Sequence, residues 1–298
     1  MNRKVTIDAL KKKRDAVILA HNYQLPEIQD VADFVGDSLE LSIQAKETDA
    51  DTIVFCGVDF MAETAKILCP EKTVLLPVKD ATCPLANYLD AETILKAKEM
   101  HPGAPVVLYI NSTAESKAYA DVVCTSANAV KVVRSLPSDE VIVGPDANLA
   151  AFIQDQLPQK KIIPVPPEGH CYVHDYFTEQ DVREARRRGG MIICHPECRP
   201  GIQKISDIIA STGGMVSAAP QAEVWNIFTE KGMAYRLKTL FPDKTFYVKE
   251  EAICEDMKKT TLDDLVSSLE KNQYRIELSR EVMDRARNAI ERMIEIGR

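Results

Sequence analysis

The stretch that decides the fold is Ala16-Val17-Ile18-Leu19-Ala20-His21-Asn22-Tyr23, a short apolar run that ends in polar side chains. Two later stretches have the same design: Val106-Val107-Leu108-Tyr109-Ile110-Asn111 and Met191-Ile192-Ile193-Cys194-His195-Pro196-Glu197. Short β-branched runs without alternation are typical of strands buried on both faces of a parallel sheet. We therefore expect three equivalent strands, each followed by residues suited to chemistry.

Two further markers repeat with the same period. A hydroxyl residue lies seventeen positions beyond His21, Tyr109 and His195, and these hydroxyls are Ser38, Ser126 and Thr212. Later in each unit, after another apolar run, an acidic residue and two more residues precede a cysteine, and these cysteines are Cys83, Cys171 and Cys254. The hydroxyls are 88 and 86 residues apart, and the cysteines 88 and 83. Two markers with one period indicate a threefold structural repeat.

Each unit is predicted to run strand–helix–strand–helix–strand, which gives an α/β fold of three pseudo-equivalent three-layer αβα domains with parallel sheets around a central site. We expect these domains to span residues 1–86, 87–173 and 174–258. Residues 259–298 contain two amphipathic helical patterns, which we expect to pack back on the body rather than bind a membrane or a partner helix.

Composition narrows the function classes. The 298 residues are 45% hydrophobic and 28% charged, as in ordinary globular proteins, which excludes disordered, collagen-like and disulfide-rich classes. A net charge of −8 argues against nucleic acid or an anionic membrane as a partner. No apolar run reaches the ~20 residues that span a bilayer, and the first residues lack the apolar core of a signal peptide. We expect a cytoplasmic protein whose eight cysteines are thiols, metal ligands or catalytic groups.

The three repeated cysteines are candidate metal ligands. Ligands of parallel α/β sheets bind beyond the carboxyl ends of the strands, so three units with these edges turned inward would bring Cys83, Cys171 and Cys254 into one cavity. An iron–sulfur cluster held by three cysteines would keep one iron open as a Lewis acid. Zinc held by three thiolates, with His170 or His174 as a fourth ligand, is an alternative. Three small core side chains would be a purely structural interpretation.

The remaining cysteines are expected in the hydrophobic core: Cys56, Cys69, Cys124, Cys194 and Cys198. Cys194 and Cys198 flank His195-Pro196-Glu197, but the alternation of side chains along a strand does not predict that their sulfurs meet. No CxxC motif occurs in the chain, which argues against a zinc ribbon or a thioredoxin-like site.

The three repeated hydroxyls have two interpretations. They could be helix N-caps, a structural role that Ser and Thr often fill. Alternatively, they could mark helix N-termini that bind an anion, because free N–H groups and the helix dipole favour negative charge there. Their threefold occurrence favours anion binding. Candidate general acids and bases are His21, His174, His195, Tyr23, Tyr109 and Glu197.

A series of motifs occurs in order over about residues 15 to 260: Ala20-His21-Asn22-Tyr23-Gln24, Gly36-Asp37-Ser38, Ala81-Thr82-Cys83-Pro84, Tyr109-Ile110-Asn111-Ser112-Thr113, Cys124-Thr125-Ser126-Ala127-Asn128, Gly169-His170-Cys171, His195-Pro196-Glu197-Cys198 and Ser211-Thr212-Gly213. With these motifs the sequence resembles the quinolinate synthase family. The resemblance implies three αβα domains around a four-iron four-sulfur cluster with three cysteine ligands and one open iron. The ligands it implies are Cys83, Cys171 and Cys254.

The resemblance also implies a reaction. Iminoaspartate (iminosuccinate) would condense with dihydroxyacetone phosphate, with dehydration and cyclisation, to give quinolinate, phosphate and water in de novo NAD biosynthesis. This is a transferase-class activity, and its imine substrate would come from an aspartate oxidase or dehydrogenase. The implied substrate contacts are His21, Ser38, Tyr109, Asn111, Ser126, His195, Glu197 and Thr212. The implied catalytic groups are Tyr23, Tyr109, His174, His195 and Glu197.

One departure from the family pattern has a functional consequence. Some members carry a CxxCxxC run at the third ligand, whereas here Cys254 is followed by Glu255-Asp256-Met257, so redox regulation through such a cysteine pair is not expected. Two other function classes remain open on the residues alone. One is a different three-cysteine iron–sulfur dehydratase acting on a small polycarboxylate. The other is an iron–sulfur sensor or carrier, for which His195 and Glu197 would be dispensable.

Overall fold

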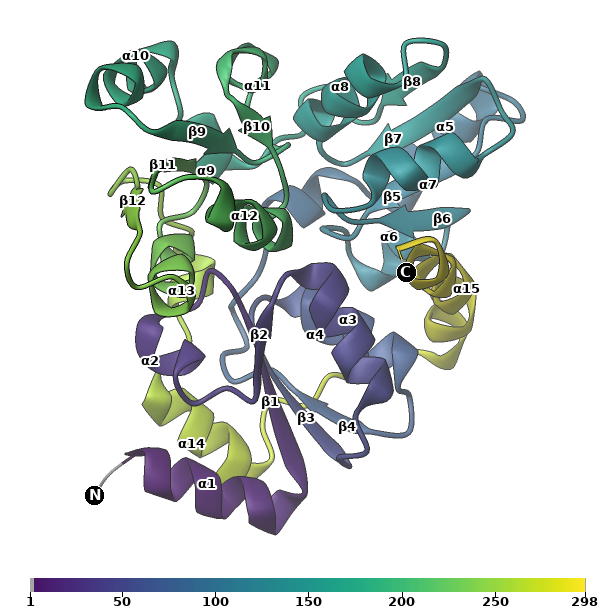
Figure 1. Cartoon of the computed structure of the whole chain (residues 1–298). Coiled ribbons are helices and arrows are strands. Elements are labelled where there is room, and N and C mark those ends of the chain that lie inside the picture. The colour runs from purple at the N-terminus through teal and green to yellow at the C-terminus, as the bar shows by residue number, and fades with distance from the viewer. Residues whose placement is uncertain (1–2, 298) are drawn as a thin grey trace.

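The computed structural model describes residues 3–297, which form three four-stranded parallel sheets with helices packed against them (Figure 1). The strand order is the same in every sheet. The first strand pairs with the second on one side and with the third on the other, and the third pairs with the fourth. The predicted class, α/β with three αβα-like units and parallel sheets, is confirmed.

The first sheet has the order β2-β1-β3-β4. Its strands are β1 (Ala16–His21), β2 (Phe34–Gly36), β3 (Thr52–Cys56) and β4 (Thr73–Leu75). The helical elements of this part of the chain are α1 (Arg3–Arg14), α2 (Pro26–Gln29), α3 (Ser38–Glu47), α4 (Asp59–Leu68) and the 3₁₀ turn η1 (Leu85–Tyr88). Every residue of β3 is buried, as its continuous apolar run predicts.

The second sheet has the order β6-β5-β7-β8 and the third β10-β9-β11-β12. The second unit comprises α5 (Ala91–Met100), β5 (Val106–Tyr109), α6 (Ala114–Lys117), β6 (Val122–Cys124), α7 (Ala129–Ser135), β7 (Glu140–Gly144), α8 (Ala147–Gln156) and β8 (Lys161–Pro164). The third comprises α9 (Tyr172–Asp175), α10 (Glu179–Arg188), β9 (Met191–Cys194), α11 (Pro200–Ile205), β10 (Ile208–Ile209), α12 (Thr212–Ala218), η2 (Ala219–Gln221), β11 (Val224–Phe228), α13 (Gly232–Leu240), β12 (Thr245–Tyr247) and η3 (Asp256–Lys258).

The prediction of three strands per unit was one strand short. Each sheet has an additional edge strand, β2, β6 or β10, which pairs with the first strand of its unit. These strands have three, three and two residues, too few to show a hydrophobic period. Each one ends shortly before the repeated hydroxyl, so that hydroxyl lies at the carboxyl edge of the sheet beside the first strand.

The two C-terminal helices cover different parts of the body. Helix α14 (Leu262–Lys271) lies beside α1 (Figure 1), and Leu265, Val266 and Leu269 share a buried cluster with Ile7. Helix α15 (Arg280–Gly297) contacts elements of both the first and the second unit, α3 and α4 as well as α6, α7 and β6. Its buried side chains are Ala286, Ala289, Ile290, Met293 and Ile294. The domain boundaries stay a prediction.

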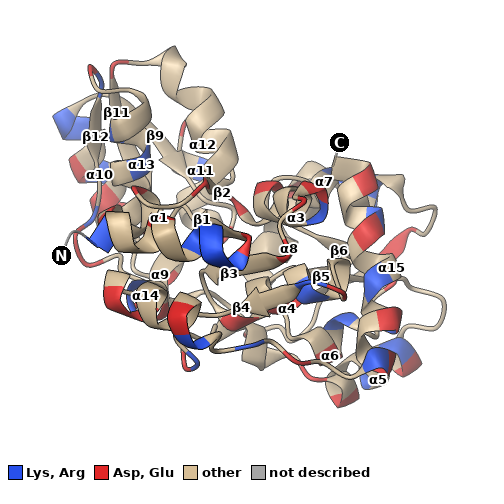
Figure 2. Cartoon of the chain, turned by 90° about the horizontal axis from the view of Figure 1, so that it is seen from below, with Lys and Arg blue, Asp and Glu red and all other residues tan. Residues whose placement is uncertain are grey.

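The charged residues of both signs lie mainly on the helices that cover the sheets (Figure 2). Figure 2 shows basic and acidic residues mixed over the outer helices, while the strands carry few charges of either sign. Among residues 3–297, no helix combines the length and the apolar character needed to cross a lipid bilayer.

Candidate active site

A single cavity lies where residues of all three units meet. It is lined by all of the site residues that the family resemblance implies: Cys83, Cys171, Cys254, His21, Tyr23, Ser38, Tyr109, Asn111, Ser126, His174, His195, Glu197 and Thr212. These residues lie at or beyond the carboxyl ends of strands. In each sheet the chain leaves the first strand toward one edge and the third strand toward the opposite edge. In parallel α/β sheets, ligands bind at the carboxyl ends of two such strands. The structure therefore brings these thirteen side chains together, while their roles stay predictions.

One backbone hydrogen bond, repeated in every unit, places the three cysteines. An amide just beyond the third strand in sheet order (β3, β7 or β11) donates to the carbonyl two residues before the cysteine. The pairs are Asp59 to Ala81 (2.9 Å), Ala147 to Gly169 (2.8 Å) and Lys231 to Ala252 (2.9 Å). In the second unit this turn requires glycine, because a Cβ at Gly169 would lie 1.9 Å from the carbonyl oxygen of Pro145. The cysteine turns are thus held against their own sheets.

The three thiols suit a soft metal. Cys83, Cys171 and Cys254 are half-buried and close enough for the charge of one to raise the pKa of another. Burial raises the pKa of all three, to about 11 for Cys254, so a thiolate needs a cation to stabilise it. Convergent thiols from three chain segments fit a metal centre.

The other cysteines lie in the hydrophobic core: Cys56, Cys69, Cys124, Cys194 and Cys198. The alternation of side chains gave no reason to expect Cys194 and Cys198 close together. Their thiols are nevertheless near enough to shift each other's pKa, because the chain turns after β9 instead of continuing as a strand. His195 and Glu197 lie between them and face the cavity.

Short polar contacts connect five side chains across the cavity. Glu197 Oε2 lies 2.7 Å from His174 Nδ1, and the Tyr109 side chain is near enough for the Glu197 charge to raise the pKa of its phenol. On its other side, His174 Nε2 lies 2.8 Å from Thr229 Oγ1, which is 2.5 Å from the Tyr23 hydroxyl. Thr229 has no role in the sequence prediction. The available signal was its place directly after β11, the kind of strand end that supplied the other residues.

The backbone fixes which ring nitrogen of two histidines carries the proton. The amide of Tyr23 donates to His21 Nδ1 (3.2 Å), and the amide of Glu197 donates to His195 Nδ1 (3.3 Å). An accepting Nδ1 has no proton, so the neutral rings carry it on Nε2. His195 Nε2 lies 3.1 Å from Ser126 Oγ. Both rings therefore offer an N–H to the cavity.

Burial sets the charge of the cavity. It lowers the pKa of His21 to about 3, with the charge of Lys258 acting in the same direction, and it lowers the pKa of His195 to about 3. Burial alone would raise the pKa of Glu197, but His174 and His195 overcome it and hold that pKa at about 2. Burial and the Glu197 charge raise the pKa of Tyr109 well above its ordinary value. At neutral pH the Glu197 carboxylate thus faces the protonated phenol of Tyr109, and the His21 and His195 imidazoles are uncharged.

The interpretation of the repeated hydroxyls as N-caps is wrong. The cap of α3 is Asp37, which accepts from two amides at 3.0 Å, and the cap of α12 is Ser211, which accepts from Gly214 at 3.1 Å. Ser38 and Thr212 are the first residues of those helices, and Ser126 precedes α7 by three residues. Because the capping is done by their neighbours, these hydroxyls are available to the cavity.

The structure also bears on zinc as an alternative metal. His170 is partly exposed, does not line the cavity, and has its Nδ1 2.8 Å from the carbonyl oxygen of Glu168. The donor atoms of Cys171, His174 and Glu197, in contrast, all lie within 4.8 Å of one another, which makes them the one metal-binding combination found among residues 3–297. His174 is therefore the better placed of the two histidines.

The chain is thus an α/β protein in which three parallel sheets turn their carboxyl edges toward one cavity. Thiols, imidazoles, phenols and a carboxylate line this cavity, which makes it a candidate metal-dependent active site. Comparison with known proteins is more specific. The family model described as "Quinolinate synthetase A protein" matches residues 5–295.

Relatives named quinolinate synthase align along almost the whole chain. The relative from Thermococcus onnurineus is 57% identical over 294 residues, 98% of this chain and 97% of the relative. That from Pyrococcus furiosus is 56% identical over 297 residues (99% and 98%), and that from Thermodesulfovibrio yellowstonii is 47% identical over 303 residues (99% and 99%). The chain belongs to the quinolinate synthase (NadA) family, which confirms the resemblance inferred from the motifs.

Replacing Thr229 tests the hydrogen-bonded chain. Thr229→Val keeps the side-chain shape but leaves the Tyr23 hydroxyl and His174 Nε2 without their shared partner. Each unpaired buried group costs about 1–3 kcal/mol, so we expect a clear fall in the free energy of unfolding measured with urea. Thr229→Ser retains the hydroxyl and should lose much less. A valine variant as stable as the parent would show that the bridge contributes nothing.

The buried state of His21 predicts how stability depends on pH. Its folded-state pKa of about 3 lies below the ordinary 6.5, so the unfolded chain binds the proton more tightly. Each pH unit below 6.5 therefore costs the fold about 1.4 kcal/mol at this site. We expect the stability difference between the parent and His21→Gln to shift in favour of the variant by that amount per unit between pH 6.5 and 5. Parallel urea-derived curves would refute the neutral buried state.

Proposed function

We propose that the chain condenses iminoaspartate with dihydroxyacetone phosphate to give quinolinate, phosphate and water in de novo NAD biosynthesis. Family membership supports this, because the relatives carry the name of that activity. The observation that carries the proposal is the cavity, in which candidate groups for binding, proton transfer and metal ligation from all three units lie together. We place the activity in the transferase class and, since the cysteines are free thiols, in the cytoplasm.

We further propose a four-iron four-sulfur cofactor held by Cys83, Cys171 and Cys254, with one iron open. Three half-buried thiols, one from each unit, line the same cavity and support this donor set. The cluster, when bound, would supply a Lewis acid that polarises a substrate oxygen. The corresponding domains are those predicted from the sequence spacing, 1–86, 87–173 and 174–258, with residues 259–298 as the covering helices.

The anionic groups of both substrates would be held by hydrogen-bond donors rather than by arginine or lysine, since in the described part of the chain, residues 3–297, neither residue type lines the cavity. The Nε2–H groups of His21 and His195 are two such donors. The others are the amide of Asn111 and the hydroxyls of Ser38, Ser126 and Thr212. Ser38 also starts the ten-residue helix α3, whose N-terminal dipole favours a carboxylate or a phosphate there.

Proton transfers would use the buried chain of hydrogen bonds. Glu197 is the base, because its low pKa keeps it ionised and it faces both His174 and Tyr109. Tyr23 and Tyr109 remain protonated and can act as acids. Since Thr229 and His174 connect Tyr23 to Glu197, a proton taken at one side of the cavity can be returned at the other without bulk water. His195, within 3.9 Å of Glu197 through its Nδ1, orients the substrate beside this chain.

The substrates place the activity within a reaction sequence. An imine of a dicarboxylic acid hydrolyses in water, so an aspartate oxidase or dehydrogenase would have to supply it continuously. The assay therefore generates iminoaspartate in the reaction mixture and adds dihydroxyacetone phosphate to protein purified without oxygen. We expect a pyridine dicarboxylate product, identified by chromatography and mass.

Glu197→Gln is the informative variant in this assay. General-base catalysis is worth about 10²–10⁴-fold, so turnover should fall by that range while the iron content stays unchanged. Glu223→Gln, an exposed carboxylate 80% accessible, is the matched control and should retain the parent rate. An iron-loaded parent that forms no pyridine would overturn the proposal. A Glu197 variant with full turnover would overturn the assigned role of this residue.

A further inference from the structure

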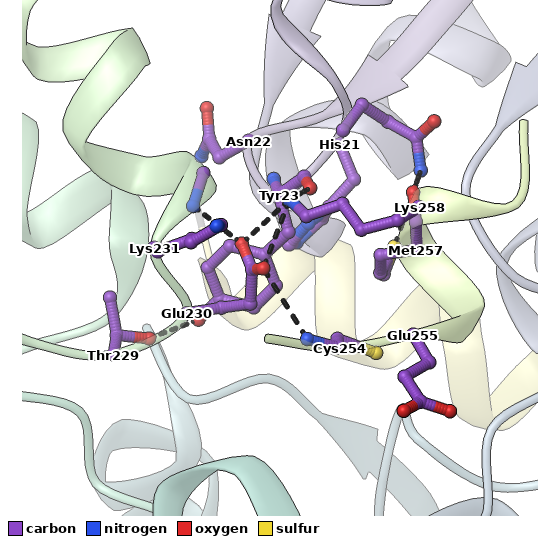
Figure 3. Close-up of polar contacts among 12 residues, drawn as sticks. His21, Asn22, Tyr23, Thr229, Glu230, Lys231, Cys254, Glu255, Met257 and Lys258 are labelled. Atoms are coloured by element: carbon purple, nitrogen blue, oxygen red, sulfur yellow. Dashed lines mark hydrogen bonds and ion pairs between the residues drawn. The ribbon is translucent and has the colours of Figure 1, made fainter. Parts of the chain in front are cut away.

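A second buried carboxylate, that of Glu230, lines the active-site cavity. Glu230 follows Thr229 at the end of β11, and its side chain is completely buried. Its two carboxylate oxygens lie 2.9 and 3.0 Å from Lys258 Nζ, as Figure 3 shows. Lys258 is at the end of η3 and its side chain is 17% exposed. Neither residue belongs to the proton-transfer chain or to the site residues predicted from the sequence.

The Glu230 carboxylate also holds backbone groups of its own unit. Oε2 accepts from the amide of Gly232 at 2.6 Å, at the start of α13. Oε1 accepts from the amide of Cys254 at 3.3 Å (Figure 3). One carboxylate therefore fixes the backbone of the third repeated cysteine relative to the strand that carries Thr229.

Lys258 connects this arrangement to the first unit. Its Nζ donates to the carbonyl oxygen of Tyr23, and the Gln24 side chain donates to the carbonyl of the adjacent Met257 at 2.8 Å. There is no spare room at this junction. A Cβ at Gly232 would lie 2.7 Å from Lys258 Nζ, 2.8 Å from Glu230 Oε2 and 2.9 Å from the Tyr23 oxygen.

Comparison of the three units shows that a buried carboxylate at this position occurs in the second and third units but not in the first. The repeated backbone hydrogen bonds make Val58, Asp146 and Glu230 equivalent, each one residue before the donating amide. Asp146 is also buried, and the amide of Cys171 is among the groups that lower its pKa. Val58 has no carboxylate, and the turn of the first cysteine is held instead by Asp256, which accepts from Thr82 at 3.1 Å. The segment from Cys254 to Lys258 thus supports the first and the third cysteine turns.

Stability alone is a weak explanation for a buried ion pair, because desolvation offsets much of its attraction. We propose that Glu230 and Lys258 are positioning residues, which lock Cys254 and the His21–Tyr23 turn at a fixed separation so that the metal ligand and the Tyr23 phenol face the same substrate. This inference rests on the cluster assignment under the proposed function. Neither residue is assigned a chemical step.

The test measures how fast iron leaves the protein. Anaerobic cluster-loaded protein is mixed with a strong iron(II) chelator, and the loss of visible absorbance gives the release rate. We expect Glu230→Gln and Lys258→Met to release iron at least tenfold faster than the parent. Glu250→Gln, which removes an exposed carboxylate paired with Lys231 at 3.6 Å, is the matched control and should release iron at the parent rate.

A double variant separates positioning from general stability. Removing both charges leaves no unpaired buried ion, so Glu230→Gln with Lys258→Met should recover most of the urea midpoint lost in the single variants. Its iron release should nevertheless remain fast, because the charged clamp on Cys254 and Tyr23 is gone. Gly232→Ala disturbs the same junction without changing a charge and should also accelerate release.

Iron release at the parent rate in the double variant and in Gly232→Ala would overturn the positioning role, as would release rates that simply follow the urea midpoints. A parent protein that binds no iron would instead overturn the cluster assignment. A parent that holds iron and forms quinolinate, together with single variants that retain iron as Glu250→Gln does, would remove only the inference about Glu230 and Lys258.

Discussion

The site depends on a backbone hydrogen bond that occurs once in each unit and ties the turn of a cysteine to the end of the neighbouring strand. Because the bond has the same register in all three units, each cysteine emerges at the carboxyl edge of its own sheet. The first strand of that sheet delivers a histidine or tyrosine to the same edge, as His21, Tyr109 and His195 show. One catalytic cavity is therefore a consequence of assembling three similar sheets with these edges inward.

Burial then determines what the assembled groups can do. In water His21 and His195 would be partly cationic, but inside the protein their pKa values fall to about 3 and they act as uncharged donors. Glu197 stays ionised because two imidazoles surround it, despite the cost of burying its charge. Among residues 3–297, no arginine or lysine lines the cavity, which is instead rich in N–H and O–H groups. Such a lining is compatible with the anionic substrates that we propose.

The sequence predicted those parts of the site that follow from local patterns. Apolar runs revealed the central strands, and a constant spacing brought out the cysteines and hydroxyls. It did not predict β2, β6 and β10, which are too short to show a period. It also gave no role to Thr229, whose hydroxyl is hydrogen-bonded to that of Tyr23, 206 positions away in the sequence.

The same limit applies to Lys258, whose contact with Tyr23 spans 235 positions. Such pairs are created by the docking of one unit on another, so no local pattern records them. The caps were misassigned for a different reason. Asp37 precedes Ser38 and Ser211 precedes Thr212, and in each case either neighbour is a chemically acceptable cap. Only the backbone geometry decides between them.

The central claim is that three chain segments far apart in sequence build one metal centre. It is tested most directly by the iron content and visible spectrum of protein purified without oxygen, for the parent and for Cys83→Ala, Cys171→Ala, Cys254→Ala and Cys69→Ala. We predict about four irons per chain in the parent and a similar sharp loss of iron in the Cys83, Cys171 and Cys254 variants. The Cys69 variant should keep the iron content of the parent, because the Cys69 thiol lies in the core and donates a hydrogen bond to the Ala45 carbonyl. A colourless parent, or a full iron complement in any of those three variants, would contradict it.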